Sequence, residues 1–380
     1  MATGPRANEP RMPRNFGLDV LRAFAILLVL ASHCGQAVPW WFGARAASRI
    51  PAAIGAYGTY GVVVFFALSG FLVGGIALRA MSSGPNLRSI GTFLVRRWMR
   101  TVPLYYAAIL LFLVATPPST GWLHHVLSYA TFTQNFASDM PSDRWFATSW
   151  SLTVEEWFYL GLGTAGLGLA RLVRPGVAAW CCVVILVGVP TLLRWALPSR
   201  MWFAYADVLW FDCIAFGLAM ARIVSRGRIP VAMSVLLAGA GAWCGWTVLA
   251  GRLLLPAVLF VTLMPSTMAT SAVLLIPLAL HWKAASGWPA RVVRWISTRS
   301  YGLYLFHPAV LHLVGSFVVS RAVSPGHGAP RWLACGGIVV VTAGSCLLAE
   351  LGHRLVERPV MRLRPREDAC RPAVALALVA

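Results

Sequence analysis

Long apolar runs alternate with short polar or basic segments along most of the chain. About 20 apolar residues in a helix cross a hydrocarbon core of about 30 Å, so the pattern predicts about ten membrane-spanning helices. These predicted spans are 16–36, 58–79, 102–116, 148–170, 177–197, 203–224, 230–250, 260–281, 300–320 and 333–355. The third is short, and three prolines within 252–281 favour extra or broken helices there.

Composition agrees with this pattern. Hydrophobic residues make up 58% of the chain and charged residues 12%, with a mean hydropathy of +0.71. No soluble domain of this length needs so much apolar content. The predicted fold class is therefore an all-α integral membrane bundle of about ten transmembrane helices. The transmembrane domain is expected at 16–359, between cytoplasmic tails at 1–15 and 360–380.

The formal net charge of +20 has two interpretations. A basic chain can bind nucleic acid, but here the arginines gather at the ends of the apolar runs. They are concentrated in every second connecting segment, the ones expected on the cytoplasmic side. That distribution follows the positive-inside rule, places both termini in the cytoplasm and makes a nucleic-acid partner unexpected. The first run is too long for a cleaved signal sequence and is expected to stay as a helix.

The cysteine pattern predicts no metal or disulfide framework. Eight cysteines are spread through the chain and none forms a CxxC pair. Most lie inside apolar runs, where cysteine behaves as a small hydrophobic residue. No metal cofactor is therefore expected.

The first apolar run carries ionisable residues that a plain membrane span does not need. Arg22 and His33 are eleven positions apart, about three helical turns, so they share nearly one face about 16 Å apart. Asp19 lies close to that face. A charged side chain inside a bilayer is costly, so this stripe predicts a functional site. His33 is the candidate catalytic base, although a membrane histidine can also simply bond to a neighbouring helix.

Two adjacent carboxylates, Glu155 and Glu156, lie early in the fourth predicted span. Neighbouring residues on a helix point about 100° apart, so both cannot face one partner. One could orient an imidazole while the other binds an arginine, with a structural ion pair as the alternative. Ser69 in the second span is a weaker candidate as a nucleophile, because the adjacent Gly70 favours close helix packing.

Two further groups of residues are candidates for the site. Arg97 and Arg100 share a face at the start of the third span, and paired guanidiniums form a fork that suits phosphate. A positive-inside anchor or a lipid headgroup contact would use the same spacing. His307, which precedes the kink-forming Pro308, is expected to line a cavity at the inner side of the ninth span.

The longest segment between spans, 117–147, is expected outside the membrane. It mixes aromatic with small polar residues, which suits a sugar-binding surface. An interfacial aromatic belt is the simpler interpretation. Residues considered there are Trp122, His124, His125, Asn135, Asp139, Asp143 and Trp145.

Together these segments resemble the membrane-bound acyltransferase family 3, of the O-antigen O-acetylase type. Each motif alone is weak, but six occur in the expected order over nearly the whole chain. They are Leu18–Arg22 with His33, Gly61–Leu72, Phe93–Pro103, Trp150–Tyr159, Ser300–His307 and Val356–Pro359.

The resemblance implies an O-acyltransferase of the bacterial cytoplasmic (inner) membrane, in contact with membrane lipids. It would move an acyl group, expected to be acetyl, from cytoplasmic acetyl-CoA (acyl-CoA) to a hydroxyl of a cell-surface or exported glycan or a lipid-linked saccharide. Arg22, Arg97 and Arg100 would hold the donor. His33 would deprotonate the acceptor or carry the acyl group briefly, with Glu155 or Glu156 orienting it.

Two alternatives remain open. The acceptor could be a hydrophobic small molecule such as a macrolide, acylated from the cytoplasm. The chain could instead be a transporter or flippase that uses the same ionisable residues as an ion relay.

One departure from the family pattern concerns a buried acid. The family often places an arginine two residues before this aspartate, but Trp210 stands at that position before Asp212. Asp212 is therefore expected to lack its usual partner. Asp207 and Glu350 are further acids within the spans with no assigned partner.

Overall fold

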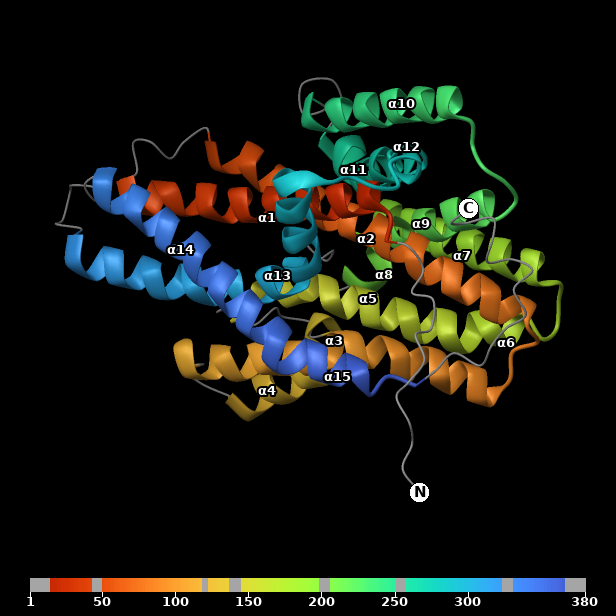
Figure 1. Ribbon diagram of the computed structural model, residues 1–380, viewed down its shortest axis with the longest axis horizontal. Helices are drawn as coiled ribbons and strands as arrows, with labels where there is room; N and C mark the ends of the chain where they lie inside the picture. The colour runs from red at the N-terminus through yellow and green to blue at the C-terminus, as the bar shows by residue number, and fades with distance from the viewer. Residues whose placement is uncertain are drawn as a thin grey trace.

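The computed structural model describes residues 14–42, 50–117, 122–136, 145–197, 206–250, 257–322 and 331–365. All regular secondary structure in these ranges is helical, which confirms the predicted all-α class. Long helices packed side by side make up most of the molecule (Figure 1). The helices are α1 (Phe16–Phe42), α2 (Ile50–Ser82), α3 (Leu87–Ala115), α4 (Trp122–Ala130), α5 (Trp150–Gly161), α6 (Leu167–Leu169), α7 (Pro175–Ala196), α8 (Ala206–Leu209), α9 (Phe211–Val224), α10 (Val231–Ala250), α11 (Ala257–Leu274), α12 (Ile276–His281), α13 (Gly287–Ala322), α14 (Arg331–Gly352) and α15 (Arg358–Arg362).

Seven helical stretches in the described residues are long and apolar enough to cross a membrane. They support a multi-pass membrane protein and coincide with the first, second, third, fifth, seventh, eighth and tenth predicted spans. The other three predicted spans fall on α5 with α6, on α9 and on α13. The count of ten and the orientation of the termini therefore remain predictions.

The start of α1 is fixed against the end of α12. The side-chain oxygen of Asn15 accepts from the backbone N–H of Leu18 at 3.1 Å, as an N-terminal cap does. The first two N–H groups of α1, those of Phe16 and Gly17, donate to the carbonyls of Lys283 and Trp282 at 3.1 and 2.9 Å. A Cβ on Gly17 would lie 2.0 Å from the carbonyl oxygen of Ala279, so only glycine fits this junction. These contacts hold the charged first turns of α1 in place.

Glycines allow α2 and α9 to approach closely at the centre of the molecule. A Cβ on Gly70 would lie 1.9 Å from the carbonyl oxygen of Ile214, and one on Gly217 would lie 2.2 Å from that of Ala67. Backbone-to-backbone contact of this kind is how small residues join membrane helices. The packing role predicted for the small residues beside Ser69 is confirmed.

The prediction that Asp212 lacks a partner is wrong. The guanidinium of Arg194 on α7 donates to both carboxylate oxygens of Asp212, at 3.1 and 2.6 Å, and neither side chain is exposed to solvent. Ser266 on α11 completes the group by donating to the same carboxylate at 2.6 Å. An arginine from another helix thus occupies the role that Trp210 cannot fill.

The other unassigned acids have mixed outcomes. Glu350 forms ion pairs with Arg299 on α13, at 2.8 Å, and with Arg354 at 2.5 Å. The side chain of Asp207 lies outside the described residues. The expected break within 252–281 is present, because α11 ends at Leu274 and α12 begins with Pro277 in its first turn.

The segment 117–147 is partly packed into the protein. Asn135 and Trp145 are buried, and Asn135 donates to the carbonyl of Trp150 at 3.0 Å. Trp122 is exposed, as an interfacial aromatic residue would be. Asp139, Asp143 and the side chain of His125 lie outside the described residues.

Candidate active site

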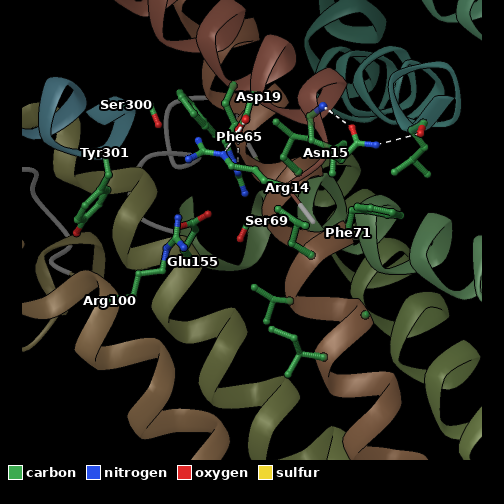
Figure 2. A pocket seen from close by; sticks show the side chains of 18 of the residues that line it. Arg14, Asn15, Asp19, Phe65, Ser69, Phe71, Arg100, Glu155, Ser300 and Tyr301 are labelled. Carbon is green, nitrogen blue, oxygen red and sulfur yellow. Dashed lines mark hydrogen bonds and ion pairs between the residues drawn. The ribbon is translucent and has the colours of Figure 1, made fainter. Parts of the chain in front are cut away.

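One cavity of about 540 Å³ brings together most of the residues singled out from the sequence. Its walls come from α1, α2, α3, α5, α9, α12 and α13 and from the segments that follow α9 and α12. Figure 2 shows the polar part of this cavity between the start of α1 and the facing side chains of α3 and α5. Of the nine predicted site residues, six line it: Asp19, Arg22, Ser69, Arg97, Arg100 and Glu155.

The cavity wall is strongly cationic. Seven of the lining residues are arginine or lysine and only Asp19 and Glu155 are acids. Because like charges gathered in a partly enclosed space attract anions strongly, this cavity suits a polyanionic ligand. The cationic residues are Arg14, Arg22, Arg79, Arg97, Arg100, Arg228 and Lys283. Sequence reasoning missed four of them, since Arg14, Arg79, Arg228 and Lys283 fitted the positive-inside rule equally well.

Asp19 is already neutralised by its neighbours. Arg14 forms an ion pair with it at 2.7 Å, and the hydroxyl of Ser297 donates to it at 2.7 Å. Arg22, three residues along α1, lies farther from the same carboxylate at 3.8 Å. Asp19 and Arg22 of the predicted stripe therefore share one face of α1 toward the cavity, and Asp19 leaves much of the charge of Arg22 available there.

The arginine pair of α3 spans from the buried interior to the surface. Arg97 is only 9% exposed, whereas Arg100 is exposed at the edge of the cavity. Glu155 on α5 lies beside Arg100 in Figure 2. In the same wall, the hydroxyls of Ser69 and Tyr159 form a hydrogen bond at 2.6 Å. Glu155 thus faces the arginines of α3, as one of the two glutamates was expected to do.

Glu156 points away from this cavity. The hydroxyl of Thr101 on α3 donates to its carboxylate at 2.6 Å, and the side chain is buried. No described contact joins Glu156 or Glu155 to His33, so the orienting role suggested for a glutamate has no support in the geometry.

The hydrogen-bonding partner of His33 is His307. Their Nδ1 and Nε2 atoms are 3.0 Å apart and their ring centres 4.9 Å apart. The expectation that His307 lines a cavity at the inner end of its helix is therefore wrong. The helix α13 already begins at Gly287, so His307 lies well inside it, buried at the level of His33.

The contacts of this pair define where its protons lie when both rings are neutral. Nδ1 of His307 is 2.9 Å from the carbonyl oxygen of Leu303, which can only accept, so this Nδ1 carries a proton. Nε2 of His307 then has a lone pair and accepts from Nδ1 of His33. That leaves Nε2 of His33 with its own lone pair, the form that a general base requires. The assignment of protons follows from the partners rather than from observed hydrogens.

Tyr304 connects the cavity to the histidine pair. It lines the cavity, and its ring centre lies 6.1 Å from that of His307, one turn along α13. Its hydroxyl donates to the carbonyl of Thr148 at 2.8 Å and lies 2.7 Å from the hydroxyl of Ser151. The histidine pair therefore lies close to the cationic cavity, with the hydrogen-bonded Tyr304 in contact with both.

Within the described residues, no group of three or more His, Cys, Asp or Glu side chains is placed to hold a metal ion. The histidine pair offers only two metal ligands. The carboxylate of Asp19 is already paired with Arg14 and Ser297.

Comparison with known proteins gives a consistent result. A family model described as an acyltransferase domain matches residues 15–350. The chain is 27% identical over 389 aligned positions to YrhL of Bacillus subtilis (strain 168), with 90% of this chain and 54% of that protein covered. It is 25% identical over 394 positions to OatA of Listeria monocytogenes, with 91% and 55% covered. Both names describe a peptidoglycan O-acetyltransferase, and the chain spans about half the length of each protein. No solved structure matches the chain.

Proposed function

We propose that this chain is an O-acyltransferase that binds its acyl donor in the cationic cavity. The chain belongs to the acyltransferase family, whose domain model matches residues 15–350. The observation that carries the proposal is the composition of that cavity, where seven cationic side chains face two carboxylates. A donor such as acetyl-CoA carries several phosphate charges on one end and a short acyl thioester on the other. Its charge and shape suit a cavity whose lining combines seven cationic side chains with many apolar ones.

The phosphates of the donor would bind at the exposed edge of the cavity. Arg100 is exposed there, whereas Arg22 and Arg79 are partly buried and Arg97 is buried. Guanidinium groups bind phosphate oxygens in pairs of parallel hydrogen bonds. The lining also has apolar side chains such as Phe65 and Leu68, against which the pantetheine part of the donor can lie. This arrangement directs the thioester toward Tyr304.

The histidine pair would then supply the base. Nε2 of His33 takes the proton of the acceptor hydroxyl while that oxygen forms a bond to the acyl carbon of the thioester. The carbon–sulfur bond breaks, and the departing thiolate receives the proton from His33 as the thiol forms. During this step His33 is positively charged, and its Nδ1–H donates to the neutral His307.

The acceptor proposed here is a glycan hydroxyl presented from the outer side of a bacterial cytoplasmic membrane. The relatives named above carry peptidoglycan in their names. In the predicted topology the first turns of α1, with Arg22, face the cytoplasm, while His33 lies toward the outside. Donor and acceptor would thus enter from opposite faces and meet beside the histidine pair.

The test uses purified protein in lipid nanodiscs with radiolabelled acetyl-CoA and soluble glycan fragments. Label should move to the glycan, and His33→Ala should abolish the transfer while His312→Ala, a change at an exposed histidine of α13, should leave it intact. Arg97→Ala should instead raise the apparent KM for the donor. Acetyl-CoA that is neither bound nor turned over by folded protein would reject the proposal in favour of a transporter. Transfer to a macrolide, with none to glycan, would reject the glycan acceptor alone.

A further inference from the structure

We propose that a groove between α7 and α9, separate from the cationic cavity, binds the headgroup of an anionic phospholipid. One end of the groove is formed by three arginines, Arg174, Arg222 and Arg226. Its remaining wall is an apolar stretch of α7. No lining residue of the groove also lines the cationic cavity, so this site does not depend on the proposed function.

The arginines of the groove have no acidic partner among the described residues. The lining contains no carboxylate, and none of the three forms an ion pair with a described side chain. Arg222 donates from Nη1 to the hydroxyl of Ser225 at 3.2 Å, while its Nε is buried without a hydrogen-bond partner. Three cations with no acidic side chain beside them form a site that attracts an anion from outside the chain.

The position of Arg222 is fixed by the backbone of α7. A Cβ added to Gly176 would lie 2.6 Å from Nη2 of Arg222, so the guanidinium packs directly on the first turn of that helix. Arg174 immediately precedes the helix and Arg226 follows α9. The groove thus holds three guanidiniums around the junction of two helices rather than on one flexible loop.

The apolar wall indicates that the anion carries hydrocarbon chains. Val177, Val184 and Ile185 are 50%, 68% and 57% exposed, and they follow one another along α7 away from the arginines. Trp180, which suits the boundary between headgroups and acyl chains, lies half-buried among them. A free phosphate would use the arginines but leave this wall uncovered, whereas a phospholipid covers both parts.

The predicted topology places the arginine end at the cytoplasmic surface. Both the start of α7 and the end of α9 are expected on that side, where the charged headgroups of anionic lipids attract basic residues. Basic pockets between helices at this level are suited to such headgroups. Charge complementarity and the adjoining apolar wall therefore agree on one occupant, a phospholipid with a net negative headgroup.

The experiment is native mass spectrometry of the full-length protein in detergent, titrated separately with phosphatidylglycerol, phosphatidylcholine and inorganic phosphate. Wild-type protein should retain phosphatidylglycerol in preference to phosphatidylcholine. The double substitution Arg222→Gln/Arg226→Gln should weaken that binding about thirtyfold, because it removes the binding free energy that two basic side chains contribute near an anionic headgroup. The matched control Arg358→Gln/Arg362→Gln removes the same charge from α15 and should change it less than about twofold.

A second variant guards against loss of folding in the first. Gly176→Leu keeps every charge but fills the space beside Arg222, so it should also displace phosphatidylglycerol. Equal retention of phosphatidylglycerol by wild type and both variants would overturn the proposal. Equal binding of phosphatidylcholine would overturn the anionic preference, and full displacement by millimolar inorganic phosphate would show an ion site rather than a lipid site.

Discussion

Replacing His307 should separate its role from those of His33 and of the donor cavity. His307 contacts Nδ1 of His33 at 3.0 Å but does not line the cavity. We therefore expect His307→Ala to lower kcat without changing the KM for the acyl donor by more than about twofold. A residue of this kind positions the base rather than touching the reactants.

The size of the effect follows from the change of charge on His33 during the reaction. A hydrogen bond between neutral groups contributes about 1 kcal/mol, whereas one to a charged group contributes about 1.5–3 kcal/mol. His33→Ala removes the proposed base itself, and a general base contributes about 10²–10⁴ in rate. His307→Ala removes only the partner that stabilises the charged ring, so kcat should fall about 10- to 100-fold.

The assay is steady-state transfer of labelled acetyl from acetyl-CoA to glycan by protein in nanodiscs, with thermal unfolding recorded for each variant. His307→Gln should recover part of kcat, because an amide oxygen can accept from Nδ1 of His33 in place of the imidazole. The double variant His33→Ala/His307→Ala should lose no more activity than His33→Ala alone, since both act in one unit. An unchanged kcat in folded His307→Ala protein, or a loss confined to KM, would refute this reasoning.

Three further predictions concern other parts of the structure. Gly17→Ala places a Cβ against the carbonyl of Ala279, so unfolding in detergent should occur at a lower temperature, which a thermal-shift measurement checks. Asp212→Leu leaves the buried Arg194 charge unpaired and should cost about 3–5 kcal/mol, while the double change Arg194→Leu/Asp212→Leu should recover most of that stability in a denaturant titration. The apparent KM for the acyl donor should rise with ionic strength in wild type and rise less steeply in Arg97→Ala, because the variant has lost one of the charges that salt screens.

The sequence predicted what lies along one helix better than what lies between helices. The spacing of Asp19 and Arg22 correctly placed both on one face, because helical periodicity fixes which side chains share a stripe. It could not identify Arg14 and Ser297 as the partners of Asp19, since Ser297 is 278 positions away. Nothing in the periodicity of α1 or α13 encodes how those two helices pack.

The histidines show the same division more sharply. His33 and His307 were each recognised as unusual polar residues in apolar runs, but they were assigned to opposite sides of the membrane. The assignment for His307 failed because the predicted ninth span began at residue 300, whereas α13 begins at Gly287. Thirteen additional residues, about 20 Å of helix, move His307 from the end of a helix to its interior. Arg194 offered a similar signal in the sequence. A charged residue within the otherwise apolar fifth span implies a buried acidic partner, and that partner is Asp212.

The arginines of the chain therefore do not all serve one purpose. Positive-inside orientation depends on cations in loops and at helix ends, and it requires no burial or fixed geometry. Arg97 is 9% exposed and faces a cavity lined by six other cations and only two carboxylates, so positive charge there exceeds what the chain itself balances. Orientation in a membrane would be achieved equally well by an exposed residue such as Arg100 one turn later. The burial of Arg97 thus has no topological explanation, and it supports the proposal that the cavity binds an anionic donor.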